Sequence, residues 1–181
     1  MTTPVLYVLG AAAPPVLGIA EAVHRAQADG WDVCLGLTPT AASWVEEQLP
    51  VLETLTGHPV RSKHRRPTEP DVWPPADVAL VAPATFNTIN QWALGFTANF
   101  VAGFAAEAIG KKIPLVTMPC VNQALARHPQ FERSVETLRQ AGVSVLYGES
   151  GFVPNPPGSG RPASYPWDIA LSEAKRILET A

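Results

Sequence analysis

The sequence predicts one α/β domain, a three-layer Rossmann-like sandwich in which helices cover both faces of a mostly parallel sheet. Short, continuously apolar runs typical of buried parallel strands recur along the chain. Segments with helical spacing of apolar residues separate them. The 181 residues show no internal repeat and no linker. A single domain spanning residues 1–181 is therefore expected.

Five segments are predicted to form strands, and Val78-Ala79-Leu80-Val81-Ala82 has the clearest pattern. The others are residues 5–9, 32–37, 113–118 and 143–146. Residues 57–75 and 148–166 are rich in proline and are predicted to be loops, the first with at most a short strand around Val60.

Helices are expected between these strands. The first begins at Pro14-Pro15, since proline is tolerated in a first helical turn, and ends at Gly30. The alanine-rich segment from Thr88 to Gly110 is predicted to be helical with a break near Gly95. The remaining helices are predicted at residues 42–48, 131–141 and 167–179.

Composition and charge exclude several classes of function. The chain is 46% hydrophobic and 16% charged, which is typical of a folded protein, and its net charge of −3 offers no basic surface for nucleic acid. No signal peptide and no membrane span are expected from the pattern. Cys34 and Cys120 match neither a metal-binding spacing nor a disulfide framework, so we expect no metal site and a cytoplasmic location.

Small and hydroxyl residues follow three predicted strands, at the edge where such a sheet binds ligands. The segments are Gly10-Ala11-Ala12-Ala13, Thr38-Pro39-Thr40-Ala41-Ala42-Ser43 and Pro83-Ala84-Thr85-Phe86-Asn87-Thr88. Small residues let main-chain N–H groups approach a phosphate, and hydroxyls donate to its oxygens. The G-x-G-x-x-G dinucleotide signature is absent. Thr38, Ser43 and Asn87 are explained equally well as turn or helix-cap residues.

The segment Ala82 to Thr88 resembles the Pro-Ala-Ser-Ala-Asn-Thr motif of the homo-oligomeric flavin-containing cysteine decarboxylases. Pro83, Ala84, Asn87 and Thr88 match the motif. Two later segments follow in the family's order: Gly95-Phe96-Thr97-Ala98-Asn99-Phe100-Val101 resembles Gly-x-x-Asp-Asn-Leu-Leu, and Pro119-Cys120-Val121-Asn122 resembles Pro-x-Met-Asn. The resemblance implies a flavodoxin-like fold.

The resemblance also implies FMN as the cofactor, held by residues of the strand-end loops. The implied set is Gly10, Ala11, Ala12, Thr38, Ser43, Pro83, Ala84, Thr85, Phe86, Asn87 and Thr88. The implied catalytic residues are Asn87, Asn122 and His64, with Asn122 holding the carboxylate of the substrate.

The family's reaction is the oxidative decarboxylation of a cysteine carboxylate, which forms an enethiol. A family histidine assists it, but Glu69 stands at the counted position, and the nearest histidine, His64, lies five residues earlier. His64 either reaches the site from a rearranged loop or is a surface residue beside Arg65. Tyr147 stands where the phosphopantothenoylcysteine enzymes carry a flap cysteine, which favours an enethiol-forming enzyme that acts on a C-terminal cysteine of a peptide.

Two other functions compete with this one. A catalytically divergent family member would keep FMN and act as a partner subunit or on another substrate; the missing histidine favours it. A flavin prenyltransferase is disfavoured, because the segments after Thr88 and near residue 119 lack that family's basic phosphate-binding pattern. The expected partners are a small-molecule or peptide substrate and further copies of the chain, since family members form trimers, some of them assembled into dodecamers.

Overall fold

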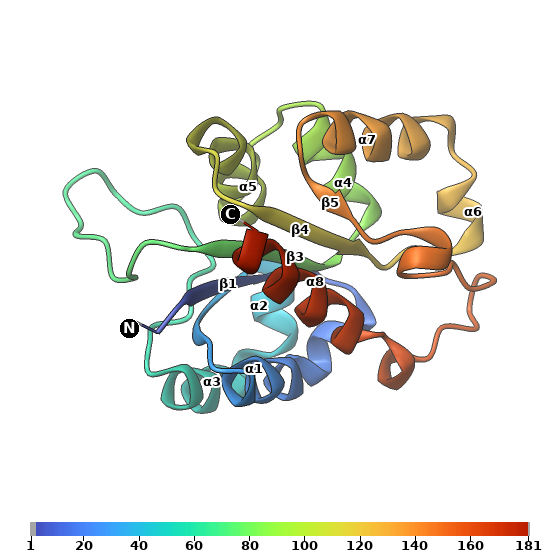
Figure 1. The fold of residues 1–181 in the computed structure, drawn as a ribbon. Helices are drawn as coiled ribbons and strands as arrows, with labels where there is room; N and C mark the ends of the chain where they lie inside the picture. Colours follow the sequence, from blue (N-terminus) through green and yellow to red (C-terminus); the bar gives the residue numbers. More distant parts are fainter. Residues whose placement is uncertain (1–2, 181) are drawn as a thin grey trace.

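The computed structural model describes residues 3–180 and has a five-stranded, all-parallel sheet at its centre (Figure 1). The strand order is β2-β1-β3-β4-β5, with every neighbouring pair parallel. The strands are β1 Val5–Gly10, β2 Asp32–Leu37, β3 Val78–Ala84, β4 Leu115–Pro119 and β5 Ser144–Val145. The predicted Rossmann-like α/β fold is confirmed, and all five predicted strands are present.

Alternate residues of the strands face two separate hydrophobic cores, as the period of a strand requires. Leu80 packs on one face, against helices α1, α2, α3 and α8. Its neighbours Ala79 and Val81 pack on the other face, against α4, α5 and α7. The helices are α1 Ile19–Ala28, α2 Pro39–Trp44, α3 Leu49–Thr56, α4 Phe86–Ala93, α5 Phe100–Lys111, α6 Gln123–Ala126, α7 Pro129–Gln140 and α8 Trp167–Thr180.

The predicted break in the long alanine-rich helix is confirmed. Helix α4 ends at Ala93, and Gly95 has a φ of +76°, which favours glycine. A new helix, α5, begins after Asn99. The Oδ1 of Asn99 accepts from the N–H of Ala102 at 3.1 Å and so caps α5. The break lets α5 pack back onto the sheet, where it contacts β2, β3 and β4.

Helix α3 was not predicted, because Pro50 interrupts the periodic pattern that would have revealed it. In the structure Pro50 lies in the first turn of α3, where its missing N–H costs no hydrogen bond. The predicted helix 42–48 is shorter than expected: α2 ends at Trp44, and a 3-10 turn covers Glu46–Gln48. The first predicted helix likewise begins as a 3-10 turn, Pro14–Gly18.

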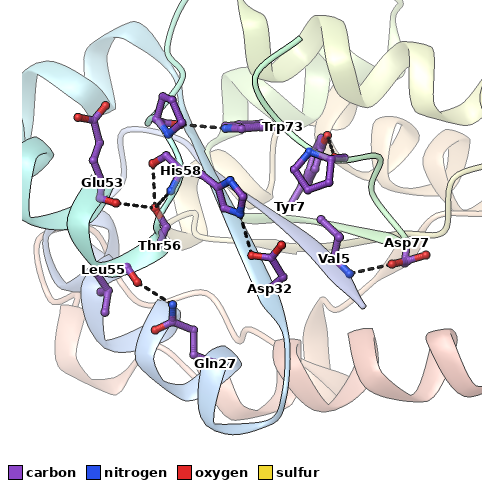
Figure 2. Close-up of polar contacts among 12 residues, drawn as sticks. Val5, Tyr7, Gln27, Asp32, Glu53, Leu55, Thr56, His58, Trp73 and Asp77 are labelled. Carbon is purple, nitrogen blue, oxygen red and sulfur yellow. Dashed lines mark hydrogen bonds and ion pairs between the residues drawn. The ribbon is translucent and has the colours of Figure 1, made fainter. Parts of the chain in front are cut away.

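The loop between α3 and β3 is attached to the sheet rather than free, as Figure 2 shows. His58 Nε2 lies 2.8 Å from Asp32 Oδ1 at the start of β2. Further along the loop, Trp73 Nε1 donates to the carbonyl of Pro59 at 2.8 Å and closes the loop on itself. The predicted strand around Val60 is reduced to a single bridge between Arg61 and Gly36.

The far end of the same loop is anchored at the amino end of β1. The hydroxyl of Tyr7 donates to the carbonyl of Pro74 at 2.5 Å, and the N–H of Val5 donates to Asp77 Oδ2 at 2.7 Å (Figure 2). Burial raises the pKa of Tyr7 well above its ordinary range, so this hydroxyl stays a donor. The loop therefore begins beside the amino end of β2, reaches the carboxyl end of β2 at Arg61 and returns to the amino end of β1.

Candidate functional site

The main cavity lies where the order of the strands reverses. The chain runs from β1 outward to β2 and then returns to β3 on the other side of β1, and ligands of open α/β sheets bind at such a reversal. The cavity has a volume of about 570 Å³, within the usual range for a cofactor or substrate site. Its lining residues are Ala12, Ala13, Pro14, Thr85, Phe86, Asn87, Cys120, Val121, Asn122, Leu125, Phe152, Asn155, Pro156, Gly158 and Gly160.

The loop after β1 is tied to the loop after β3. The N–H of Ala11 donates to the carbonyl of Pro83 at 2.8 Å, which holds the two strand ends together. Ala12 and Ala13 then line one wall of the cavity, and their methyl side chains let a ligand approach the main chain closely. This wall therefore carries small side chains of the kind that the sequence predicted at the ligand site.

The loop after β3 forms the opposite wall. Thr85 caps α4, because its Oγ1 accepts from the N–H of Thr88 at 3.2 Å. The hydroxyls of Thr85 and Thr88 are also 3.0 Å apart. Phe86 and Asn87 occupy the first turn of α4 and line the cavity, while Thr88 is buried behind them. This wall presents a hydroxyl, an amide and the amino end of an eight-residue helix.

Asn122 follows β4 and caps the short helix α6. Its Oδ1 accepts from the N–H of Leu125 at 2.9 Å. With the oxygen engaged in this way, Nδ2 remains as the donor that Asn122 can present to the cavity. An amide nitrogen in this place can bind an anionic group without adding a charge.

The segment after β5, residues 147–166, folds back over the cavity, and we call it the flap. The N–H of Gln123 donates to the carbonyl of Asn155 at 2.8 Å, and Asn122 and Asn155 form a parallel bridge. Deeper in, the hydroxyl of the buried Tyr165 donates to the carbonyl of Met118 at 2.5 Å. These contacts bring Phe152, Asn155, Pro156, Gly158 and Gly160 to the cavity.

The cavity is uncharged, because its lining residues include no aspartate, glutamate, lysine, arginine or histidine. Cys120 is its single ionisable group, and burial raises the pKa of the thiol to about 11. At neutral pH the thiol is therefore protonated and acts as a small, weakly polar surface.

This pKa predicts slow alkylation of Cys120 by iodoacetamide at neutral pH. Only about one thiol in 10,000 is ionised at pH 7, so the rate should rise about tenfold per pH unit up to pH 10. Peptide mapping by mass spectrometry measures the alkylation rate. Glutathione is the reference thiol, and its alkylation rate should level off above about pH 9. Cys34 is buried with a pKa of about 12 and should react more slowly still. Rapid, pH-independent modification of Cys120 would contradict this assignment.

Several residues of the predicted cofactor set lie behind the cavity rather than on its surface. Gly10 packs so closely that a Cβ there would lie 2.9 Å from Ile19 Cδ1. The N–H of Thr38 donates to the carbonyl of Gly10, and its Oγ1 accepts from Ala41 as the cap of α2. Ser43 lies on the exposed side of α2, where its hydroxyl donates to the carbonyl of Thr40. Ala11, Pro83, Ala84 and Thr88 are buried and are not among the lining residues of the cavity.

His64 is not among the lining residues of the cavity. Its ring packs against α5, because a Cβ on Gly103 would lie 2.9 Å from His64 Cε1. Together with Glu69 it borders a separate surface hollow formed by the loop between α3 and β3. Figure 1 shows this loop on the side of the molecule opposite α6. Of the three predicted catalytic residues, the fold brings Asn87 and Asn122 together and leaves His64 apart.

The flap residues of the cavity were missed by sequence reasoning, as were Pro14, Val121 and Leu125. Phe152 and Asn155 lie in a proline-rich segment without periodicity, so no local pattern marks them. The one available signal was Gly158-Ser159-Gly160-Arg161, which resembles a Gly-x-Gly-Arg turn of the decarboxylases.

The donor set of the cavity fits a flavin. An isoalloxazine ring needs apolar surfaces on its faces and neutral donors and acceptors along its edge, and Phe86, Val121 and Asn87 are of these kinds. A phosphate can bind without lysine or arginine where main-chain N–H groups, a hydroxyl and a helix amino end converge, as they do at Thr85.

Comparisons with known proteins agree with the fold described above. The family described as Flavoprotein matches residues 7–171. A probable phosphopantothenoylcysteine decarboxylase of Streptococcus mutans is 26% identical over 140 residues, which cover 74% of this chain and 76% of the relative. Among solved structures, the FMN-dependent cysteine decarboxylase TvaF from thioviridamide biosynthesis aligns with a TM-score of 0.73 at 21% identity, covering 98% and 99% of the two chains. The FMN-binding protein AtHal3 aligns with a TM-score of 0.71 at 17% identity, covering 99% of each chain. These structures share the fold.

Proposed function

The chain belongs to the flavoprotein family, and on that premise we propose that its main cavity binds FMN and that it oxidatively decarboxylates a C-terminal cysteine of a peptide. The observation that carries this proposal is the meeting of the loop Thr85–Asn87 with Asn122 in one uncharged cavity at the strand reversal. The names of the solved neighbours, which are described as FMN-dependent or FMN-binding, support the cofactor.

The residues divide between cofactor and substrate according to their place on the cavity wall. Ala12, Ala13 and Thr85 would hold the phosphate and ribityl end, and Phe86 and Asn87 the ring. FMN, when bound, supplies a two-electron oxidation by accepting a hydride from the carbon that bears the sulfur. Asn122 would hold the carboxylate through Nδ2 until it leaves as CO₂. The apolar flap residue Phe152 would keep water from the reacting carbon.

The experiment that tests the reaction uses purified protein and peptides that end in cysteine. We expect flavin absorption bands in the purified or FMN-reconstituted protein, and a product lighter than the peptide by one CO₂ and two hydrogens. A protein that cannot be reconstituted with FMN would contradict the cofactor assignment. Flavin uptake without mass loss across a broad peptide library would contradict the decarboxylation and point to the divergent flavoprotein.

Replacing Asn87 by aspartate is expected to weaken FMN binding about tenfold or more. The change places a negative charge in the cavity wall, near the flavin edge and the helix end that would face the phosphate. Equilibrium titration followed by flavin fluorescence measures the effect. The matched control is Asn99→Asp, which keeps its helix-capping oxygen and lies outside the cavity. Equal affinity of the Asn87→Asp variant and the wild type would remove Asn87 from the site.

We also propose that the chain assembles into a homo-oligomer in the cytoplasm. The turn between α4 and α5 exposes two large apolar side chains, with Leu94 55% and Phe96 62% exposed, and such side chains favour burial between subunits. Both cysteines are free thiols, which suits a reducing compartment. None of the helices within residues 3–180 has the length and apolar character needed to cross a bilayer. Light scattering should give a mass of at least twice the 19.3 kDa of one chain, whereas a mass of 19.3 kDa would contradict the assembly.

A further inference from the structure

The flap contributes one polar side chain to the cavity that the proposed chemistry leaves without a role, that of Asn155. Its main chain is firmly placed. The carbonyl of Asn155 accepts from the N–H of Gln123 at 2.8 Å, and the side chain of Gln123 donates to the carbonyl of Pro154 at 3.3 Å. Proline on either side of Asn155 further restricts the backbone. The position of Asn155 is thus determined by its contact with the loop after β4.

The two asparagines of this contact differ in what they can offer a ligand. Asn122 uses Oδ1 to cap α6, so it presents donors. The side chain of Asn155 makes no hydrogen bond to any of residues 3–180, so both its oxygen and its nitrogen are available. It is half-buried and lines the cavity beside the apolar Phe152. A donor-only group and an acceptor group therefore stand side by side.

The terminal residue of a peptide offers the complementary pair. Its carboxylate and its N–H are attached to the same Cα, so the groups that bind them must come from neighbouring positions. Asn122 and Asn155 are bridge partners on parallel segments, which places their main chains about 4.8 Å apart. A carboxylate bound to Asn122 would then bring the adjacent N–H within reach of Asn155 Oδ1.

We propose that Asn155 is a specificity-determining residue that accepts the N–H of the terminal residue of the substrate and so selects N-acylated cysteine over free cysteine. This inference rests on the proposed function, since it concerns the substrate half of the same cavity. Free cysteine carries an ammonium group, which would lose its hydration in a cavity whose walls contain no carboxylate. An amide N–H needs only an uncharged acceptor, which Asn155 supplies.

The test measures binding without turnover. The probes are acetyl-alanyl-serine, in which a hydroxyl replaces the thiol, and its depsipeptide analogue, in which an ester oxygen replaces the terminal N–H. Isothermal titration of the FMN-loaded wild-type protein should show about tenfold tighter binding of the amide probe. Asn155→Leu, which keeps the size but removes the acceptor, should bind both probes equally.

Two further variants make the result specific. Ser150→Ala changes a flap residue outside the cavity and should keep the tenfold preference. Asn155→Asp retains an acceptor beside the carboxylate of the probe. This variant should keep the preference for the amide probe while binding both probes more weakly. It also provides a second test if Asn155→Leu fails to fold.

The outcomes separate this inference from the proposed function. A wild-type protein that removes CO₂ from cysteine peptides but binds the two probes equally, or binds neither, overturns the role of Asn155 alone. An unchanged preference in Asn155→Leu does the same. A protein that takes up no FMN and leaves cysteine peptides intact overturns the proposed function itself.

Discussion

Asn122→Asp is expected to lower the rate of decarboxylation by about 10²–10³-fold, with flavin still bound. The substitution exchanges the amide donor that faces the cavity for a carboxylate oxygen of nearly the same size. The substrate carboxylate then loses a hydrogen bond and meets a like charge in a cavity that has no cation to offset it. Rates measured by CO₂ release from a cysteine-terminated peptide test this result.

The same substitution contains its own structural control. Aspartate keeps the oxygen that caps α6, so the contact with the N–H of Leu125 persists and the melting temperature should change little. Asn122→Ala loses the cap as well, and should cost about 1 kcal/mol of stability besides the activity. If Asn122→Asp retained wild-type rates, the substrate carboxylate would have to bind elsewhere.

Gly151→Ala is expected to displace the flap and to destabilise the protein by about 2 kcal/mol or more. A Cβ at this position would lie 2.7 Å from the Cα of Leu146 and closer still to its carbonyl, so the clash involves main chain that no rotamer change can relieve. The turn it disrupts is held by the N–H of Phe152, which donates to that same carbonyl at 3.2 Å.

Both effects of Gly151→Ala can be measured. The melting temperature should fall by about 4–8 °C, and decarboxylation should fall at least about tenfold, because Phe152 and Asn155 leave the cavity together. The matched control is Gly110→Ala in α5, where a Cβ meets nothing within 4 Å; it should be neutral or slightly stabilising. A fully active and stable Gly151→Ala protein would show that the flap does not close the site.

The site has two parts, which differ in how far the sequence predicts them. The strand-end loops were predicted from the sequence, because a buried strand followed by small or hydroxyl residues is a local signal. The cavity does contain Ala12, Thr85, Phe86 and Asn87. Asn122 was found by its place in the motif after β4. In contrast, Gly10, Thr38 and Ser43 share the same local chemistry, yet packing and capping place them behind the cavity or outside it.

The sequence by itself determined the parallel α/β fold, the strand that leads to the main loop and the flavin resemblance, since each depends on residues close together in the chain. Only the tertiary structure decided the other half of the site. The flap meets the loop after β4 through residues about thirty positions apart, Gln123 and Asn155, in a segment whose prolines give no periodic pattern. The position of His64 was decided in the same way, because the anchors of its loop at Asp32 and Tyr7 lie far from it in sequence.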